Sequence, residues 1–320
     1  TPAGGERTNT ARMQVAGQAE PSSTVRVYRS GAELASTSAD SDGRFSTAVT
    51  LVEGENALTA TASNRGGTGP ASAPVLVTLD TSIPDAPRGL LADAREGGQI
   101  RLSWTPVPGV AGYRVYRAPG PFSDAAAAEE VAGTTTAYAG TTYDDLPPAD
   151  GRYYYRVVSV TDVGTESALS SEASAVADGT PPRALEVAYL PAGAHDPGSG
   201  RMAPGVVDVT VTVSERLLTT PFLSITPEDG RPIPVELRVT SDTTYAGQFE
   251  IKDTTPTGTA YAVFSARDRV GNQGYEVETG ASIAIDTDGP VVQSLATDPP
   301  DPIRNDQAAP VTVTLQIELD

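Results

Sequence analysis

Acidic residues gather around the last quarter of the chain, and carboxylates are the ligands that a calcium ion would need. Asp286 and Asp288 are two residues apart, Asp298 and Asp301 follow them, and Asp268 precedes them. Calcium takes about six to eight oxygen ligands, mostly carboxylates and backbone carbonyls. The pattern favours an ion-free polar junction at Asp286 and Asp288, with a structural calcium ion there as the alternative. The full ligand set stays unassigned.

Other motifs that could bind a metal ion or a receptor are better explained as turns. Asp40-Ser-Asp42-Gly43 resembles a calcium loop but lacks a glutamate at the right distance. Asp-Gly-Arg triplets, which also suit turns better than integrin-type recognition, begin at Asp42, Asp150 and Asp229.

The sequence lacks the residues that metal–thiolate chemistry or a catalytic triad requires. The chain has no cysteine, which excludes zinc–thiolate sites, thiol nucleophiles and disulfides. His195 is the one histidine, and it lies in a Gly/Pro-rich stretch that predicts a loop. No Gly-x-Ser-x-Gly motif accompanies it, and no pattern places two carboxylates across a cleft. We therefore predict no catalytic residues, no required cofactor and no enzyme activity.

The charge excludes two classes of partner. The net charge is −19 and the isoelectric point is about 4.4, so nucleic acid and anionic membrane surfaces are excluded as partners. No apolar run approaches the ~20 residues that a membrane helix needs. An acidic chain without cysteine is typical of an exported bacterial protein.

The elements that position these residues are short strands. The 320 residues include 31 Gly and 27 Pro, which excludes long uninterrupted helices. Apolar and polar residues alternate in 24–28, 44–51 and 57–62, the period of a strand with one buried face. Such strands bury their apolar face against a second sheet, so we expect an all-β chain of β-sandwiches.

Three similar connectors divide the chain. Each begins at the end of a strand with an aspartate, Asp80, Asp178 or Asp286, and continues into a Pro-containing stretch. A polar hairpin turn with glycine precedes each connector, around Asn64, Asp162 and Asp268. The repetition predicts domains over 1–80, 84–178 and 183–288 joined by short Pro-containing linkers, and the start of a fourth over 291–320.

The first and third domains resemble bacterial Ig-like domains. Residues 15–25, 40–45 and 52–58 follow the order of motifs in the glucodextranase B-domain type, and the resemblance covers about 8–80. In the third domain, 206–213 alternates and Asp268 to Asn272 matches a turn common in such repeats. Residues 309–317 resemble 206–213, so we expect them to begin a fourth Ig-like unit, either continued by a longer native chain or donated to another chain.

Residues 84–178 resemble a fibronectin type III domain. Leu102-Ser-Trp104 matches the tryptophan-bearing second strand, and Tyr113-Arg-Val-Tyr116 matches the third. Tyr153 matches the tyrosine-corner residue, whose hydroxyl bonds back to the chain. The resemblance implies that Trp104 is a core residue rather than a sugar-stacking platform, and that Tyr153, Tyr155 and Val157 share a core face. Residues 123–130 depart from the pattern and predict a helical turn.

These resemblances imply a non-catalytic structural or adhesive array in an exported bacterial surface protein, located at the cell surface or outside the cell. The array would act as a rigid, extended spacer. Its expected partners are other domains of the same longer chain, cell-surface polysaccharide or protein, or further copies of itself in a filament. The alternative is a set of accessory domains, serving as spacers or carbohydrate contacts, in a secreted polysaccharide-degrading enzyme.

Overall fold

A computed structural model describes residues 5–133, 135–193, 195, 198–289, 292–298 and 314–319. The described residues are nearly all β, as the sequence predicts, and their only helical elements are two 3-10 turns, η1 (Glu96–Gly98) and η2 (Ala125–Ala127). They fall into two compact units, Thr1–Gly179 and Thr180–Asp320. Among them, no helix has the length and apolar character that crossing a membrane requires. Asp301 and residues 309–313 of the expected terminal strand lie outside the described residues.

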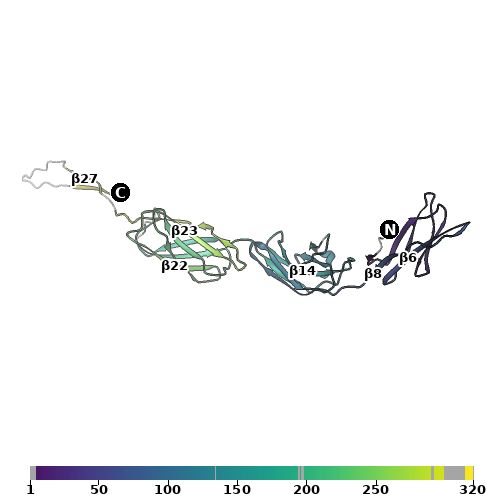
Figure 1. The fold of residues 1–320 in the computed structure, drawn as a ribbon. Helices are drawn as coiled ribbons and strands as arrows, with labels where there is room; N and C mark the ends of the chain where they lie inside the picture. Colours follow the sequence, from purple (N-terminus) through teal and green to yellow (C-terminus); the bar gives the residue numbers. More distant parts are fainter. Residues whose placement is uncertain are drawn as a thin grey trace, which may run out of the picture. The chain divides into compact units, whose positions relative to one another are not determined.

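The first sandwich pairs one large sheet with one small sheet (Figure 1). Alternation places Val25, Val27, Leu58 and Val77 in its core, each 4% exposed or less. The large sheet has the order β1 (Glu6–Thr8), β8 (Val75–Leu79), β6 (Gly54–Asn64), β3 (Thr24–Arg29) and β4 (Ala32–Ser38), with β7 (Gly67–Thr68) on β6. The small sheet is the antiparallel pair β2 (Arg12–Gln18) and β5 (Arg44–Thr50).

The second sandwich lies in the same unit and packs a three-stranded sheet on a four-stranded one. Tyr155 and Val157 of the central strand β14 (Gly151–Val160) are fully buried between the sheets. The smaller sheet has the order β13 (Thr142–Asp145), β10 (Ile100–Thr105) and β9 (Arg88–Ala94). The larger has the order β12 (Glu129–Ala132), β11 (Gly112–Ala118), β14 (Gly151–Val160) and β15 (Ala173–Ala177).

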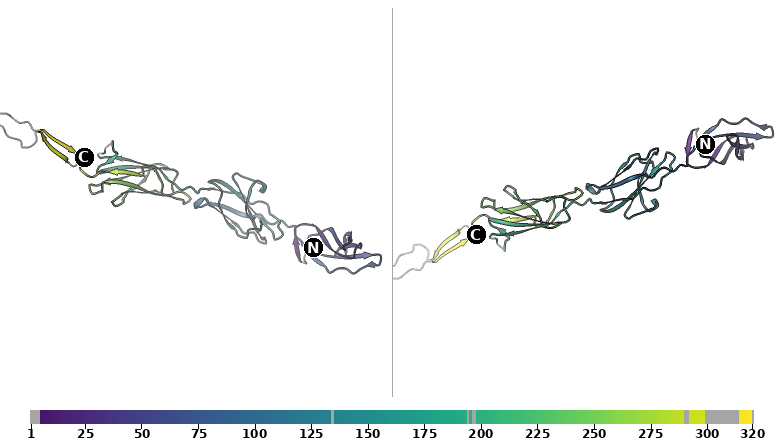
Figure 2. Two further views of the ribbon diagram at one scale, coloured as in Figure 1. Left: turned by 90° about the horizontal axis from the view of Figure 1, so that it is seen from above. Right: turned by 90° about the horizontal axis from the view of Figure 1, so that it is seen from below.

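The third sandwich forms the body of the second unit, and Figure 2 shows its strands from two further sides. Its core joins Val209 and Val211 of one sheet to Leu223, Ile225 and Phe264 of the other. One sheet has the order β21 (Arg238–Val239), β22 (Thr244–Ile251), β18 (Gly205–Val213), β16 (Ala184–Pro191) and β25 (Val277–Thr279). The other has the order β17 (Arg201–Met202), β26 (Ser282–Ile285), β23 (Gly258–Arg267), β19 (Phe222–Pro227) and β20 (Ile233–Pro234), with β24 (Gln273–Gly274) on β23.

Two further strands follow, β27 (Val292–Asp298) and β28 (Thr314–Leu319). They form an antiparallel pair whose register repeats that of β16 and β18. Leu295 lies opposite Ile317 as Val187 lies opposite Val211, and a bulge interrupts both pairs at the same place, after Val292 and after Ala184. The pairing of β27 with β28 is therefore that of the first two long strands of the third sandwich.

Candidate functional site

The junction at Asp286 and Asp288, where calcium is the alternative that the sequence leaves open, contains one ion pair. The Asp286 carboxylate accepts a hydrogen bond from Arg201 Nη1 at 3.2 Å, and its other oxygen accepts one from the Asp288 backbone N–H at 3.3 Å. The structure thus brings Asp286 together with Asp288 and a cation from β17. A calcium ion at Asp286 and Asp288 stays an alternative that the sequence leaves open.

Asp268 holds its own turn together. Its Oδ1 accepts hydrogen bonds from the backbone N–H groups of Val270, Gly271 and Asn272 at 2.7–2.9 Å, and its Oδ2 accepts one from Asn272 Nδ2 at 2.6 Å. The residue is fully buried. A carboxylate oxygen of Glu215, a residue that the sequence did not single out, lies within 4.8 Å of one of Asp268. Since four hydrogen bonds already engage Asp268, its role is to fix the hairpin between β23 and β24.

The other candidate motifs take the structures that the sequence predicts. Asp40 Oδ1 accepts hydrogen bonds from the N–H groups of Asp42 and Arg44, which makes this motif a hairpin turn. His195 is exposed in the loop between β16 and β17, where one isolated bridge joins it to Met202. Asp124 caps η2 by accepting a hydrogen bond from Ala126 N, which confirms the helical turn expected in 123–130.

An aromatic cluster fills the core of the second sandwich. Trp104 is 6% exposed and meets Tyr113 edge to face, with ring centroids 5.3 Å apart. The Tyr113 hydroxyl oxygen accepts a hydrogen bond from the backbone N–H of Val107 at 2.8 Å. The ring of Trp104 is therefore packed inside the sandwich. A core role for Trp104, as the sequence predicts, is confirmed.

Tyr153 bonds back to the chain that leads into its strand. Its hydroxyl donates to the backbone carbonyl of Ala149, four residues earlier, at 3.1 Å. Its ring packs against the same core that buries Tyr155 and Val157. This geometry confirms the tyrosine corner and the shared core face.

Sequence reasoning missed a buried ionic network next to this core. Arg117 on β11 is 8% exposed and donates from Nη1 to both oxygens of Asp145, at 2.9 and 3.0 Å. Its Nη2 donates to Glu129 at 2.6 Å, and the Tyr155 hydroxyl donates to Asp145 at 2.8 Å. Because β11 and β13 belong to opposite sheets, the network joins the two layers of the sandwich.

The network shifts the protonation equilibria of its members. Burial lowers the pKa of Arg117, but its hydrogen bonds to Glu129 and Asp145 outweigh burial and raise that pKa above its ordinary value. Burial, followed by the hydrogen bond to Asp145, raises the pKa of Tyr155. Arg117 is therefore a cation and Tyr155 a neutral donor at physiological pH.

The second sandwich matches a known domain family. Residues 92–178 match the family described as "Fibronectin type III domain SaeA third domain". Together with the packed tryptophan and the tyrosine corner, the match decides the assignment. Residues 92–178 form a fibronectin type III domain. The fibronectin type III fold is typically a non-catalytic module.

Other similarities cover limited parts of either protein. The chain is 39% identical to Bacillopeptidase F of Bacillus subtilis (strain 168) over 102 residues, which is 32% of this chain and 7% of that protein. A Fn3-like protein from Clostridium thermocellum is 33% identical and covers 29% of this chain and 92% of its own, with a TM-score of 0.24. The fibronectin(III)-like modules of Clostridium thermocellum CbhA are 16% identical and cover 56% and 92%, with a TM-score of 0.37.

Outside the fibronectin type III domain, the third sandwich exposes aromatic side chains on one sheet face. Phe222 is 54% exposed, Tyr261 is 48% exposed, and Val263 beside them is 46% exposed. The register of β19 with β23 pairs Phe222 with Ser265 and pairs Thr226 with Tyr261, so all these residues share the outer face. The face offers two rings and one aliphatic side chain to solvent.

Proposed function

We propose that this chain is a non-catalytic spacer array of an exported bacterial protein, located at the cell surface or outside the cell. Its fibronectin type III domain and the sandwiches on either side of it hold other domains of a longer chain at a distance. Contact with cell-surface polysaccharide or protein belongs to this proposal. The fibronectin type III assignment supports the proposal, because this fold is typically a non-catalytic module.

One observation carries the proposal: each sandwich has a hydrophobic core of its own. Separate clusters of buried side chains centre on Val27 and Leu58, on Trp104 and Tyr155, and on Val211 and Phe264. A module whose core is complete within itself can fold and bear load without its neighbours. The connectors carry prolines, which have a fixed φ angle and restrict bending between modules.

Fractionation of native cells tests the proposal. An antibody raised against residues 84–178 should detect a surface-bound band far larger than the 33.0 kDa of this chain. A cytoplasmic protein of about this size would overturn the proposal.

A second candidate function is an accessory domain set in a secreted polysaccharide-degrading enzyme. The exposed pair Phe222 and Tyr261 favours it, because aromatic faces stack on the apolar faces of sugar rings. A moderate-sized band released into the medium would support this candidate over the surface spacer.

Binding to insoluble polysaccharides tests the aromatic pair directly. Wild-type chain should sediment with a cellulose, chitin or peptidoglycan suspension, and the double variant F222A/Y261A should not. Tyr275→Ala is the matched control, because Tyr275 is 63% exposed but lies outside β19 and β23. Equal sedimentation of all three proteins would exclude this face as a carbohydrate contact.

A further inference from the structure

The outer face of one sheet of the third sandwich carries a continuous row of apolar side chains. The register of β19 with β23 places Phe222, Val263 and Tyr261 in successive rows of this face, and each is about half exposed. The isolated bridge that precedes β19 continues the register and adds Leu218, which is 57% exposed. These four residues form what we call the apolar stripe.

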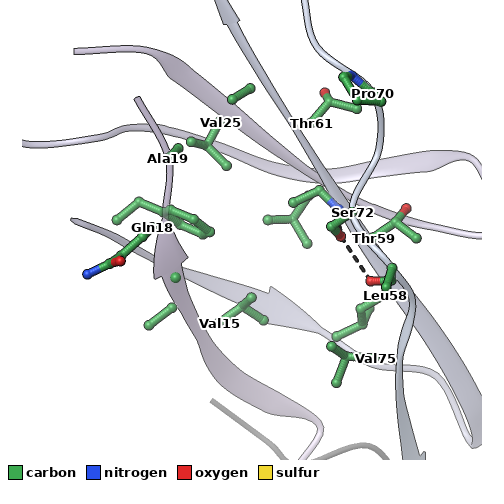
Figure 3. A pocket seen from close by; sticks show the side chains of 17 residues that line it. Val15, Gln18, Ala19, Val25, Leu58, Thr59, Thr61, Pro70, Ser72 and Val75 are labelled. Carbon is green, nitrogen blue, oxygen red and sulfur yellow. Dashed lines mark hydrogen bonds between the residues drawn. The ribbon is translucent and has the colours of Figure 1, made fainter. Parts of the chain in front are cut away.

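The first sandwich contains the same sheet without the stripe. β1, β8, β6, β3 and β4 occur in the order of β17, β26, β23, β19 and β20, and a short strand pairs with β6 as with β23. In both sheets the outermost pair, β1 with β8 and β17 with β26, is parallel. Leu58 of β6 packs with Val15 and Val75 inside the first sandwich (Figure 3). Strand alternation therefore places the next residue, Thr59, on the outer face.

The turns that follow β6 and β23 align the two outer faces. Asn64 and Asp268 each accept a hydrogen bond from the backbone N–H two residues further on. The alignment gives each stripe residue on β19 and β23 a counterpart: Arg26 for Phe222, Thr59 for Val263, and Ala57 for Tyr261. Arg26 forms an ion pair with Glu33 there. The fold itself therefore does not require an apolar stripe, and a contiguous exposed stripe marks a contact surface.

The stripe lies on a sheet without carboxylates. No Asp or Glu occurs in β17, β26, β23, β19, β20 or β24. The strands of the opposite sheet carry four, Glu186, Asp208, Glu250 and Glu278. Because the net charge of the chain is −19, two copies repel each other wherever their carboxylates meet. The sheet that carries the stripe can face its own copy without opposing carboxylates.

The stripe is also complementary to itself in shape. On β19 and β23, each large side chain lies beside a small one: Phe222 beside Ser265, Val263 beside Ser224, and Tyr261 beside Thr226. A two-fold axis close to the strand direction, between β19 and β23, sets each large side chain of one copy over the small one of the other. An isologous contact requires this kind of self-complementary patch.

We infer that the stripe is a contact between two copies of this chain, in which β19 and β23 of one copy pack face to face on those of the other. The inference goes beyond the spacer function and does not rest on it. Sheets that pack in this way are about 10 Å apart, and the side chains of the two faces interdigitate. Phe222 of each copy packs against Ser265 of the other, and Val263 of each copy packs against Ser224 of the other. The contact closes as a dimer.

A polysaccharide is the alternative occupant of this face. Only rings stack on sugars, and two of the four stripe residues, Leu218 and Val263, are aliphatic. Ser224 is 3% exposed, so its hydroxyl offers a sugar no accessible hydrogen-bonding group. Aliphatic and aromatic side chains together are what two packed sheets bury between them. The stripe therefore suits a second copy better than a polysaccharide.

Sedimentation velocity of the 320-residue chain tests the contact. We expect a concentration-dependent shift from the 33.0 kDa monomer to a dimer. The association should strengthen at higher salt, which screens the repulsion between two acidic copies. Val263→Lys should raise the dissociation constant at least about tenfold, because it places a charge in a desolvated contact. Val206→Lys is the matched control. Val206 is 42% exposed on β18 of the opposite sheet, against 46% for Val263, so this variant should dimerise like the wild type.

Phe222→Ser is a second variant that removes a half-exposed ring without adding a charge, and it should also raise the dissociation constant about tenfold. Calorimetry shows for each variant that the third sandwich is folded. A wild-type chain that stays monomeric up to about 1 mM would overturn the inference. Equal dissociation constants for Val263→Lys and Val206→Lys would overturn it too. A monomeric chain that sediments with polysaccharide, but not as F222A/Y261A, would assign this face to a polysaccharide instead of a second copy.

Discussion

Arg117 and Asp145 form a buried ion pair that joins the two sheets of the fibronectin type III domain, with Nη1 2.9 Å from Oδ1. The side chains are 9% and 5% exposed, so water contributes little to their solvation. Glu129 and Tyr155 complete the hydrogen bonds of the pair. Breaking such a pair on one side leaves an uncompensated buried charge.

Replacing Asp145 by alanine should destabilise the fibronectin type III domain by about 3–5 kcal/mol, because Arg117 then loses its carboxylate partner while remaining buried. Trp104 is the one tryptophan of the chain and lies in this domain, so its fluorescence reports the unfolding of this domain in urea. Asp144→Ala is the control. Its ion pair with Arg101 is exposed, and we expect a loss of at most about 1 kcal/mol. Equal losses for the two variants would contradict the buried network.

Tyr153→Phe removes the hydrogen bond to the Ala149 carbonyl and keeps the ring in place. We expect a loss of about 1 kcal/mol in the free energy of unfolding, measured by the same tryptophan signal. Tyr154→Phe is the control, because Tyr154 is the next residue but packs in a different cluster. It should lower the free energy of unfolding by less than Tyr153→Phe does. A Tyr153→Phe variant as stable as the wild type would show that the corner is not a stabilising contact.

Alkaline pH should weaken the fibronectin type III domain through Tyr155. Burial and the hydrogen bond to Asp145 raise its pKa above the ordinary value of 10.0. The folded domain therefore holds this proton more tightly than the unfolded chain, so the contribution is fully present below about pH 10 and is lost as pH rises through the folded pKa. The melting temperature should fall less steeply between about pH 9 and about pH 11 in Tyr155→Phe than in the wild type, although the variant starts lower. Parallel pH profiles would contradict the shift.

Gly274→Ala should disrupt the third sandwich alone. An added Cβ would lie 1.7 Å from the Pro182 carbonyl oxygen, a backbone atom that cannot give way without moving the strand. Calorimetry should show the loss or downward shift of one transition, while the Trp104 signal stays unchanged. Gly120→Ala, where a Cβ meets nothing within 4 Å, should alter neither. An unchanged calorimetric profile for Gly274→Ala would contradict the close approach.

The sequence predicts the strands and the aromatic core because both depend on local pattern. Alternation in 44–51 and 57–62 follows from the geometry of one strand, and Trp104 and Tyr153 occupy positions that a known domain family fixes. The Arg117–Asp145 pair could not be predicted, since it depends on which two strands face each other across the layers.

Stretching single molecules of the 320-residue chain tests the central claim most directly, that each sandwich is a separate load-bearing module. We expect three force peaks from the three sandwiches, each releasing roughly 25 to 35 nm of chain at about 0.36 nm per residue. A single cooperative event across residues 5–285, or extension without force peaks, would contradict an array of independently folded spacers.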